Sequence, residues 1–298
     1  MISRRRFHLG FGTALIAAHL NGWPKAARAA SSDQPLIEEI KRLESQSGGR
    51  LGVCVLETAT GVHHVHRGDE RFPMCSTFKT LAAAAVLARV DAGKEQLTRR
   101  ITFDASAIVV NSPVTEKRAG GDGMALAEIC DAAITRSDNT AGNLLLAGIG
   151  GPPGLTAFAR KLGDQVTRLD RDEPSLNQAL PDDPRDTTTP NAMASNFKTL
   201  ILDTKVLSAA SREQLTAWLI ANKTGDVRLR SGFARNWRIG DKTGAGERGT
   251  TNDVAIVWPP NGAPIIVAAY LTGASVPTAQ QNAIIASVAR AVSATISG

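Results

Sequence analysis

The order of strand-like and helix-like segments is the feature that most limits how this chain can fold. Strand-like runs lie near both ends of the chain, and helix-like runs fill its middle. Short apolar runs bounded by turn residues predict strands at Arg50–Glu57, Val62–Arg67, Trp237–Lys242, Asp253–Trp258 and Ile265–Leu271. The economical arrangement is one antiparallel sheet that both ends of the chain build together.

Helix-like segments complete the predicted architecture. Residues 35–46 carry apolar side chains at helical spacing, and the segment Thr278–Ile296 closes the chain, so two terminal helices should flank the sheet. The middle of the chain predicts helices at Thr77–Val90, Met124–Thr135, Thr140–Ala147, Leu155–Leu162, Thr189–Leu202 and Arg212–Asn222. We therefore expect an α/β fold of the α+β type, in which an all-helical domain is inserted into a sheet domain.

The boundaries of these two domains follow from the same pattern. The sheet domain should comprise residues 30–74 and 223–298, and the helical domain residues 75–222, with an active site at their interface. Residues 168–190 are rich in Asp and Pro and show little apolar periodicity. Long loops in compact domains are usually functional, so this omega-like loop is expected to serve the site.

The N-terminus has the composition of an export signal. Three arginines, Arg4 to Arg6, precede an apolar run that is too short to cross a bilayer, and Ala27-Arg28-Ala29 follows. This order predicts a signal peptide over residues 1–29, cleaved near Ala29, and Ser3–Phe7 resembles the twin-arginine motif. The alternative is a short amphipathic or membrane-anchoring helix. Export would place the mature protein in the periplasm or outside the cell.

Most of the net positive charge of the chain lies in this N-terminal segment. The formal net charge is +6, which alone would suggest binding to nucleic acid or to a membrane surface. Five of these six excess charges fall within residues 1–29, which contain no acid, so the mature chain carries only +1. No later stretch is apolar enough to span a membrane. We expect neither a nucleic-acid partner nor a membrane span.

Three short motifs carry possible chemistry. Ser76 and Lys79 share one face of a predicted helix, where a buried amine could take the proton of the hydroxyl. Ser137-Asp138-Asn139 lies between two helices, and Lys242-Thr243-Gly244 ends a predicted strand. Each has a simpler interpretation: a solvated surface pair, a helix N-cap and a strand-end turn. The three motifs in this order and at these separations nevertheless indicate one catalytic site.

These motifs resemble those of the serine β-lactamase and penicillin-binding protein superfamily. The segment Arg171-Asp-Glu173-Pro-Ser-Leu-Asn177 is similar to the omega-loop motif of class A β-lactamases, and the resemblance covers essentially all of residues 31–298. It implies hydrolysis of penicillins or cephalosporins through a serine acyl-enzyme, which gives antibiotic resistance. Two alternatives remain: a cell-wall D,D-peptidase with the same acylation machinery, and a non-catalytic β-lactam sensor.

The resemblance also implies a role for each motif residue. Ser76 would be the nucleophile, with Lys79 or Glu173 as the base that activates it. Ser137 would protonate the departing nitrogen with help from Lys242, and the backbone N–H groups of Ser76 and Ala245 would form the oxyanion hole. Asn177 would assist Glu173 in deacylation. Arg171 and Asp186 would pair across the base of the loop. The substrate would be bound by Asn139, Thr243 and Gly244.

Several positions depart from the family pattern. Thr251 stands where many relatives place an arginine, and Arg228 resembles the alternative arginine of other members, unless it is merely exposed. Asn111 stands at the mouth of the site where many members have an aromatic residue. Cys75 lacks its usual disulfide partner because that position is Gly246, and the helix that should face Cys130 offers Ala83. With Cys54 on a strand, three free thiols buried in the core are expected.

Two further patterns are weighed and set aside. Gly244-Ala-Gly246-Glu-Arg-Gly249 spells a dinucleotide fingerprint, but a strand follows it instead of a helix. His64 and His66 would point to one face of a strand, yet no zinc-binding continuation follows them, and a polar hairpin face is the simpler interpretation. We expect no metal and no cofactor, a small β-lactam as the only substrate, and a monomer.

Overall fold

The computed structural model describes residues 25–296, with side chains from Gln34 onward, so most of the predicted signal peptide lies outside the described residues. Its helices are α1 (Lys25–Ser47), α2 (Phe78–Asp91), α3 (Leu126–Thr135), α4 (Asn139–Ile149), α5 (Gly151–Lys161), α6 (Pro190–Ile201), α7 (Ala209–Ile220), α8 (Leu229–Gly232) and α9 (Thr278–Ile296). Short 3₁₀ turns lie at η1 (Cys75–Thr77), η2 (Ala105–Ala107), η3 (Thr115–Lys117) and η4 (Ser175–Asn177).

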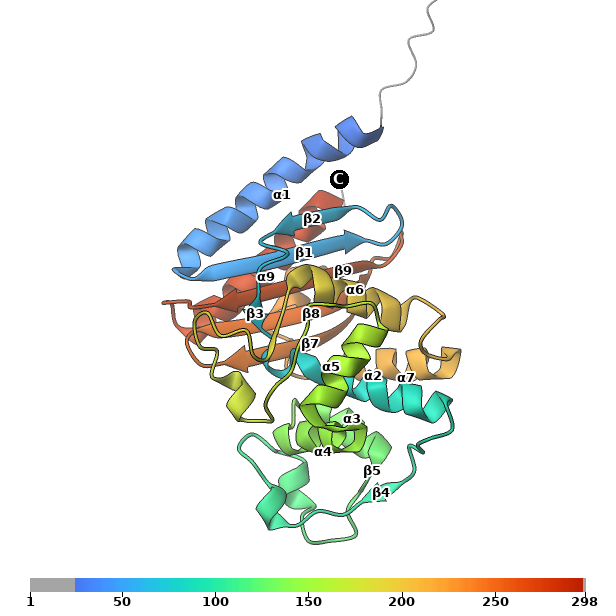
Figure 1. Cartoon of the computed structure of the whole chain (residues 1–298). Coiled ribbons are helices and arrows are strands. Elements are labelled where there is room, and N and C mark those ends of the chain that lie inside the picture. The colour runs from blue at the N-terminus through green and yellow to red at the C-terminus, as the bar shows by residue number, and fades with distance from the viewer. Residues whose placement is uncertain (1–24, 297–298) are drawn as a thin grey trace, which may run out of the picture.

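A five-stranded antiparallel sheet forms the frame of the molecule (Figure 1). Its order is β2-β1-β9-β8-β7, so strands from the two ends of the chain meet where β1 pairs with β9. The five strands are β1 (Arg50–Glu57), β2 (His63–His66), β7 (Arg238–Gly246), β8 (Thr250–Trp258) and β9 (Ile265–Thr272). Two-residue strands form separate pairs, namely β3 (Phe72–Pro73) with β6 (Thr187–Thr188) and β4 (Arg100–Ile101) with β5 (Met124–Ala125). The predicted α+β sheet built from both ends is confirmed.

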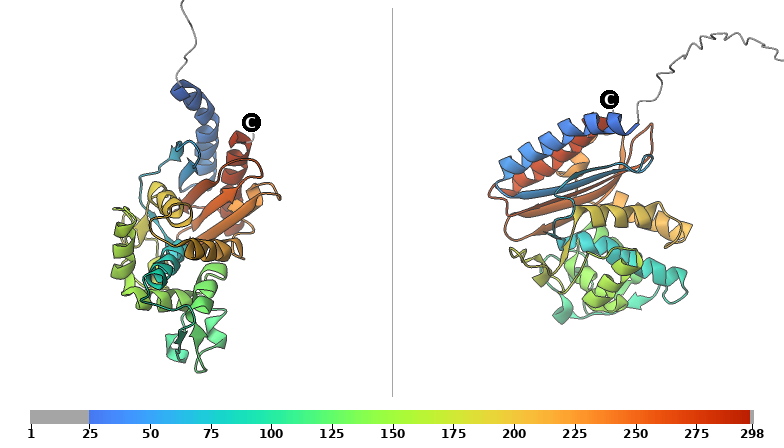
Figure 2. Two further views of the ribbon diagram at one scale, coloured as in Figure 1. Left: turned by 90° about the vertical axis from the view of Figure 1, so that its right-hand side faces the viewer. Right: turned by 45° about the horizontal axis from the view of Figure 1, so that its top comes forward.

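The central strands are buried on both faces because helices cover each side of the sheet. Along β1, Val53 and Val55 point into one apolar core and Cys54 and Leu56 into another. This alternation follows from the two-residue repeat of a strand. The first core includes side chains of α1, α8 and α9, so these helices lie on one side of the sheet, while α2 to α7 lie on the opposite side (Figure 2). The division into two domains stays a prediction.

The predicted strand at Trp237–Lys242 is too short. In the structure β7 continues to Gly246, and its ladder with β8 runs from Arg238↔Trp258 to Gly246↔Thr250. Gly244 and Gly246 lie in this extension, and they add no apolar side chain to the run from which the strand was predicted. At Gly244 a Cβ atom would lie 2.8 Å from the carbonyl oxygen of Met74, so glycine lets the strand approach the segment before Ser76. The third motif therefore lies within a strand and not at its end.

Other boundaries differ for local reasons. Helix α5 begins at Gly151, before the predicted start at Leu155, because prolines are tolerated in the first turn of a helix. The predicted helix from Thr77 is divided into the turn η1 and helix α2. The omega-like loop contains the turn η4 and the strand β6, and the short helix α8 was not predicted. Helix α1 begins earlier than expected, at Lys25.

The sheet side of the fold generates a test of stability. Ile40 on α1 is fully buried in the core that α1 shares with α9. Replacing it by alanine (Ile40→Ala) removes buried apolar groups and leaves a cavity, so the free energy of unfolding should fall by about 2–5 kcal/mol. Glu38→Ala, on the exposed face of the same helix, is the control and should change it by at most about 0.5 kcal/mol. Denaturant unfolding measures both, and equal effects would contradict the packing of α1.

Candidate active site

Ser76 lies at the point where the chain enters helix α2. It occupies the middle of η1 and is 6% exposed, and its neighbour Cys75 has a left-handed backbone with φ of 47°. Residues other than glycine rarely adopt this conformation, and they persist there only where the surrounding structure fixes them. Strand β7 packs against η1, so the third motif and Ser76 face each other across a narrow space.

Lys79 is the most enclosed cation of the site. One turn along the helix from Ser76, it is completely buried, and its Nζ donates to Ser76 Oγ at 2.9 Å, to the Ser137 carbonyl at 2.9 Å and to Asn139 Oδ1 at 2.7 Å. The same Nζ lies 2.9 Å from Glu173 Oε1. Burial lowers the pKa of Lys79 by disfavouring the ammonium, and the Glu173 carboxylate opposes that shift.

Glu173 reaches Ser76 from the omega-like loop. Ser76 Oγ donates to Glu173 Oε1 at 3.0 Å, and Asn177 Nδ2 donates a very short hydrogen bond to Oε2. Asn143 on α4 makes two hydrogen bonds to the backbone of Glu173. Its Oδ1 accepts from the Glu173 N–H at 2.9 Å, and its Nδ2 donates to the Glu173 carbonyl at 2.9 Å. Asn143 was missed from the sequence, because a helical asparagine 30 residues from Glu173 carries no motif or spacing signal.

An ion pair closes the base of the omega-like loop. Arg171 Nε lies 2.6 Å from Asp186 Oδ2, and the other oxygen of Asp186 accepts from the backbone N–H groups of Asp170 and Arg171. Asp186 is buried. Charged hydrogen bonds of this kind are about twice as strong as neutral ones, so Asp186 fixes the start of the segment that carries Glu173.

The second motif faces the third across the cleft. Lys242 is completely buried on β7, and its Nζ donates to Ser137 Oγ at 3.0 Å. Burial, and then the nearby charge of Lys79, hold the pKa of Lys242 well below its usual range. Asp138 caps helix α4 by accepting from Ala141 N–H at 2.8 Å, so the simpler N-cap interpretation applies to this residue of the motif.

Arg228 is buried, and the alternative that it is an exposed surface charge is wrong. Its Nη1 donates to the carbonyls of Gly244 at 2.7 Å and Asn252 at 2.8 Å, and its Nε donates to Asn282 Oδ1 at 2.9 Å. These contacts place the guanidinium against the third motif. Thr251, which occupies the other arginine position, donates to Gln281 instead.

A cleft of about 560 Å³ joins these residues. Its lining is mostly polar and consists of Ser76, Asn111, Ser112, Pro113, Glu116, Arg136, Ser137, Asn139, Asn177, Thr224, Arg228, Thr243 and Ala245. Asn111 is exposed at the rim, with a left-handed φ of 61°. Thr243 shares a short hydrogen bond with Thr224. The structure thus brings the residues of all three motifs and of the omega-like loop to one cleft.

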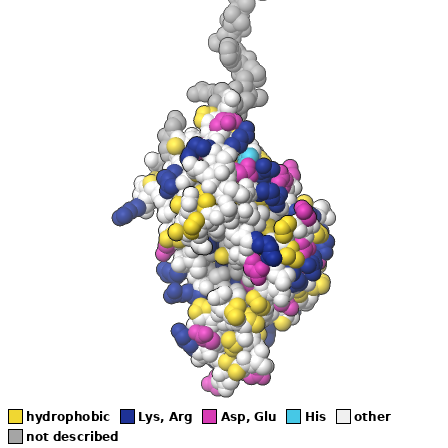
Figure 3. Space-filling model, turned by 90° about the vertical axis from the view of Figure 1, so that its left-hand side faces the viewer, with side chains coloured by type: hydrophobic (Ala, Val, Ile, Leu, Met, Phe, Trp, Pro, Cys, Tyr) yellow, Lys and Arg dark blue, Asp and Glu magenta, His cyan; other side chains and the backbone are white. Residues whose placement is uncertain are grey.

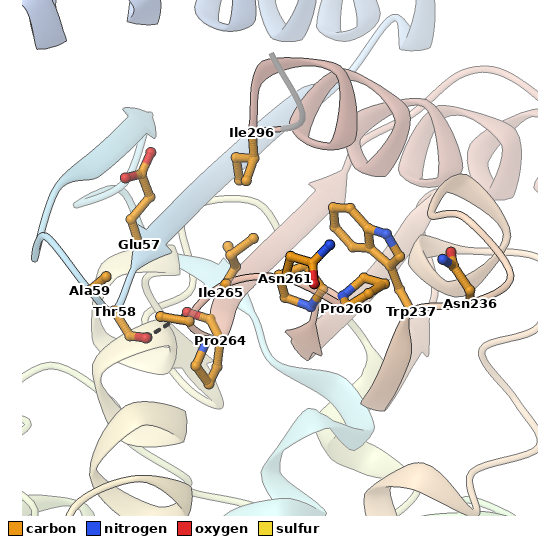
Figure 4. A pocket seen from close by; sticks show the side chains of 13 residues that line it. Glu57, Thr58, Ala59, Asn236, Trp237, Pro260, Asn261, Pro264, Ile265 and Ile296 are labelled. Atoms are coloured by element: carbon orange, nitrogen blue, oxygen red, sulfur yellow. Dashed lines mark hydrogen bonds between the residues drawn. The ribbon is translucent and has the colours of Figure 1, made fainter.

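A second cavity of about 570 Å³ lies elsewhere, by the loop between β8 and β9 and the end of α9 (Figure 4). Trp237, Pro264 and Ile296 form its walls, and Glu57 stands at one side. None of the predicted site residues lines it. Its lining residues include no serine and no lysine, so this cavity does not repeat the Ser76–Lys79 arrangement.

The two patterns that were set aside have structural roles. His64 Nε2 lies 2.8 Å from Glu57, and His66 Nε2 lies 2.9 Å from Glu44, so the histidines join β2 to β1 and to α1. Within residues 25–296, no group of three or more His, Cys, Asp or Glu side chains is arranged to hold a metal ion. The glycine-rich segment forms the end of β7 and the turn into β8, with no helix after it.

On the face shown in Figure 3, basic and acidic side chains are intermixed, in keeping with the small formal net charge of residues 30–298. Among the helices of the described chain, none combines the length and apolar character that crossing a bilayer requires.

Comparison with known proteins agrees with this fold and cleft. A family model described as the β-lactamase enzyme family matches residues 35–296. The chain is 48% identical to β-lactamase Toho-1 of Escherichia coli over 86% of this chain and 87% of that protein, and 45% identical to β-lactamase OXY-2 of Klebsiella oxytoca over 88% and 90%. An ancestral class A β-lactamase (GNCA) superimposes with a TM-score of 0.85 at 63% identity, covering 86% of this chain and 98% of that structure. The chain therefore belongs to the β-lactamase enzyme family, within class A.

The three cysteines, of which Cys75 adjoins Ser76, generate a chemical test. Cys54, Cys75 and Cys130 are free and buried, and burial raises the pKa of the Cys54 thiol to about 12 and that of the other two thiols further. Because the thiolate is the reactive form, a thiol reagent at pH 8 should leave the native protein unlabelled. Three equivalents should react after unfolding in guanidinium.

An exposed cysteine provides the control for that measurement. Ser231 lies on the surface, so Ser231→Cys should add one thiol that reacts at once in the native protein. Rapid labelling of the unsubstituted native protein would contradict the burial of its thiols.

Proposed function

We propose that this chain hydrolyses the amide bond of penicillins and cephalosporins through an acyl-enzyme on Ser76, and so gives resistance to these antibiotics. One observation carries the proposal: Ser76 Oγ lies 2.9 Å from Lys79 Nζ and 3.0 Å from Glu173 Oε1. A hydroxyl between a buried amine and a buried carboxylate can lose its proton as it attacks a carbonyl carbon.

Acylation begins with that proton transfer. Ser76 Oγ attacks the β-lactam carbonyl while its proton passes to Lys79, or through a water to Glu173; both bases are within reach, and the choice between them stays open. Burial lowers the pKa of Lys79, so its ammonium loses a proton more easily than an exposed lysine would. The backbone N–H groups of Ser76 and Ala245 would stabilise the oxyanion, each contributing about 3–4 kcal/mol.

Collapse of the tetrahedral intermediate breaks the C–N bond of the lactam. The departing nitrogen then needs a proton, which Ser137 would supply. Because Ser137 Oγ accepts a hydrogen bond from Lys242 Nζ at 3.0 Å, its own hydrogen is free to point toward the nitrogen. Lys242 can then return a proton to Ser137, which restores the hydroxyl.

Deacylation requires a water held against the ester. Glu173 would accept a proton from this water as the water attacks the acyl carbon, and the proton then returns to Ser76 as the ester breaks. Asn177 supports this role twice. Its Nδ2 fixes the Glu173 carboxylate, and its Oδ1 is buried with no hydrogen-bond partner among the described residues, so it can accept from the water.

Substrate recognition would rest on the cations at the opposite end of the cleft. Lys242, Thr243, Gly244 and Arg228 would bind the carboxylate that penicillins and cephalosporins carry beside the lactam ring. Asn139 would bind the side-chain amide of the substrate. Asn111 at the rim offers a small polar group in place of an aromatic wall, so the affinity for bulky side chains should be low.

A D,D-peptidase with the same acylation machinery is the second candidate. It would release the penicilloyl group slowly, whereas buried Glu173 with Asn177 beside it favours fast hydrolysis. A silent sensor would show neither turnover nor release. We also propose that residues 1–29 direct export, cleavage occurring near Ala29, and that the mature enzyme acts as a monomer in the periplasm or outside the cell, without cofactor or metal.

Replacing Glu173 by its amide separates these functions. Glu173→Gln keeps the shape of the side chain but removes the base, so hydrolysis of the acyl-enzyme should slow by roughly 10²-fold or more, and the adduct should accumulate. Intact-mass spectrometry after mixing with benzylpenicillin measures it.

Glu213→Gln, an exposed change on α7, is the control and should show no accumulation. If the unsubstituted protein itself holds the adduct, it acts as a D,D-peptidase. If Glu173→Gln and the unsubstituted protein release product equally fast, Glu173 is not the deacylation base.

A further inference from the structure

The turn between β7 and β8 is fastened to the omega-like loop by a contact that no motif predicts. The backbone N–H of Glu247 donates to the Asn177 carbonyl at 2.9 Å, and Arg248 Nη1 donates to the Gln178 carbonyl at 2.5 Å. Two consecutive residues of the turn thus hold two consecutive carbonyls of the loop. We call this pair of hydrogen bonds the clasp.

The turn side of the clasp is rigid. The Arg248 carbonyl accepts from the Gly273 N–H at 2.9 Å, and a Cβ on Gly249 would lie 2.1 Å from the carbonyl oxygen of Ala274, so the turn is seated on the segment after β9. Arg248 itself has a left-handed φ of 52°. A residue other than glycine keeps this conformation only where the surrounding structure fixes it.

The loop side of the clasp is connected to Glu173 through neighbouring residues of the omega-like loop. Gln178 is held from two directions, because its side-chain Oε1 also accepts from Arg171 Nη1 at 2.6 Å. The residue before it is Asn177, whose amide donates to the Glu173 carboxylate. Backbone fixed at residues 177 and 178 therefore fixes the amide that orients Glu173.

We propose that Arg248 is a positioning residue for deacylation, acting through the Gln178 carbonyl and the Asn177 amide on Glu173. The inference rests on the proposed function. In the free enzyme, Ser76 donates a hydrogen bond to Glu173. Once Ser76 is acylated it has no proton to donate, so Glu173 depends more on Asn177, and hence on the clasp. Acylation depends less on it, because Ser76 and Lys79 lie together on η1 and α2.

Three variants test this role. Arg248→Gly removes the guanidinium but suits the left-handed backbone, so the turn should persist. Arg248→Lys keeps a cationic donor for the Gln178 carbonyl. Arg185→Ala removes an arginine of similar exposure on the omega-like loop, one that pairs within the loop with Asp183 at 2.7 Å.

Steady-state kinetics and single-turnover mass spectrometry with benzylpenicillin give the readout. For Arg248→Gly, kcat and KM should fall together by about fivefold or more, while kcat/KM stays within about twofold, because kcat/KM reports acylation. The adduct should persist correspondingly longer. Arg248→Lys should recover most of kcat, and Arg185→Ala should match the unsubstituted enzyme.

Two outcomes would overturn the inference. If Arg248→Gly keeps the kcat of the unsubstituted enzyme, the guanidinium does not position Glu173. If kcat/KM falls as far as kcat, or if Arg185→Ala has the same effect, the arginine does not act selectively on deacylation. Failure of the proposed function looks different, because the unsubstituted enzyme would then turn over no β-lactam.

Discussion

The buried contact between Lys79 and Glu173 is the interaction on which the site depends. Both side chains are completely removed from solvent, and their charged atoms lie 2.9 Å apart. An uncompensated charge at such a position would cost several kcal/mol, so neither group can be placed there without the other. Ser76, Ser137, Asn139 and Asn177 complete the hydrogen bonding of the pair. The fold must therefore bring α2, the second motif and the omega-like loop together before Ser76 can be activated.

The sheet supplies the fixed edge against which this cluster is built. Strand β7 places buried Lys242 opposite Ser137 and directs Thr243 and Ala245 into the cleft. Arg228 bonds to carbonyls of β7 and β8, so the cationic end of the site is part of the sheet edge. Lys79, Lys242 and Arg228 thus gather at one cleft, which suits a single small carboxylate.

The sequence predicts the frame of this structure and the residues of its motifs, but not the contacts that hold them. Short apolar runs identify β1, β8 and β9, whereas Gly244 and Gly246 interrupt the apolar run that would mark the end of β7. Motif spacing identifies Ser76 and Glu173. Asn143 and Arg248 escape prediction because each acts on backbone groups far away in the sequence, and a hydrogen bond to a carbonyl leaves no pattern in side-chain identity.

Mapping the covalent adduct tests the central claim most directly, namely that Ser76 is the nucleophile. The Glu173→Gln enzyme would be mixed with benzylpenicillin, quenched in acid and digested with pepsin, and its peptides would be sequenced by mass spectrometry. We predict one adduct of a whole benzylpenicillin on Ser76, and none in the enzyme that also carries Ser76→Ala. An adduct on another residue, or one that persists after Ser76→Ala, would contradict the account.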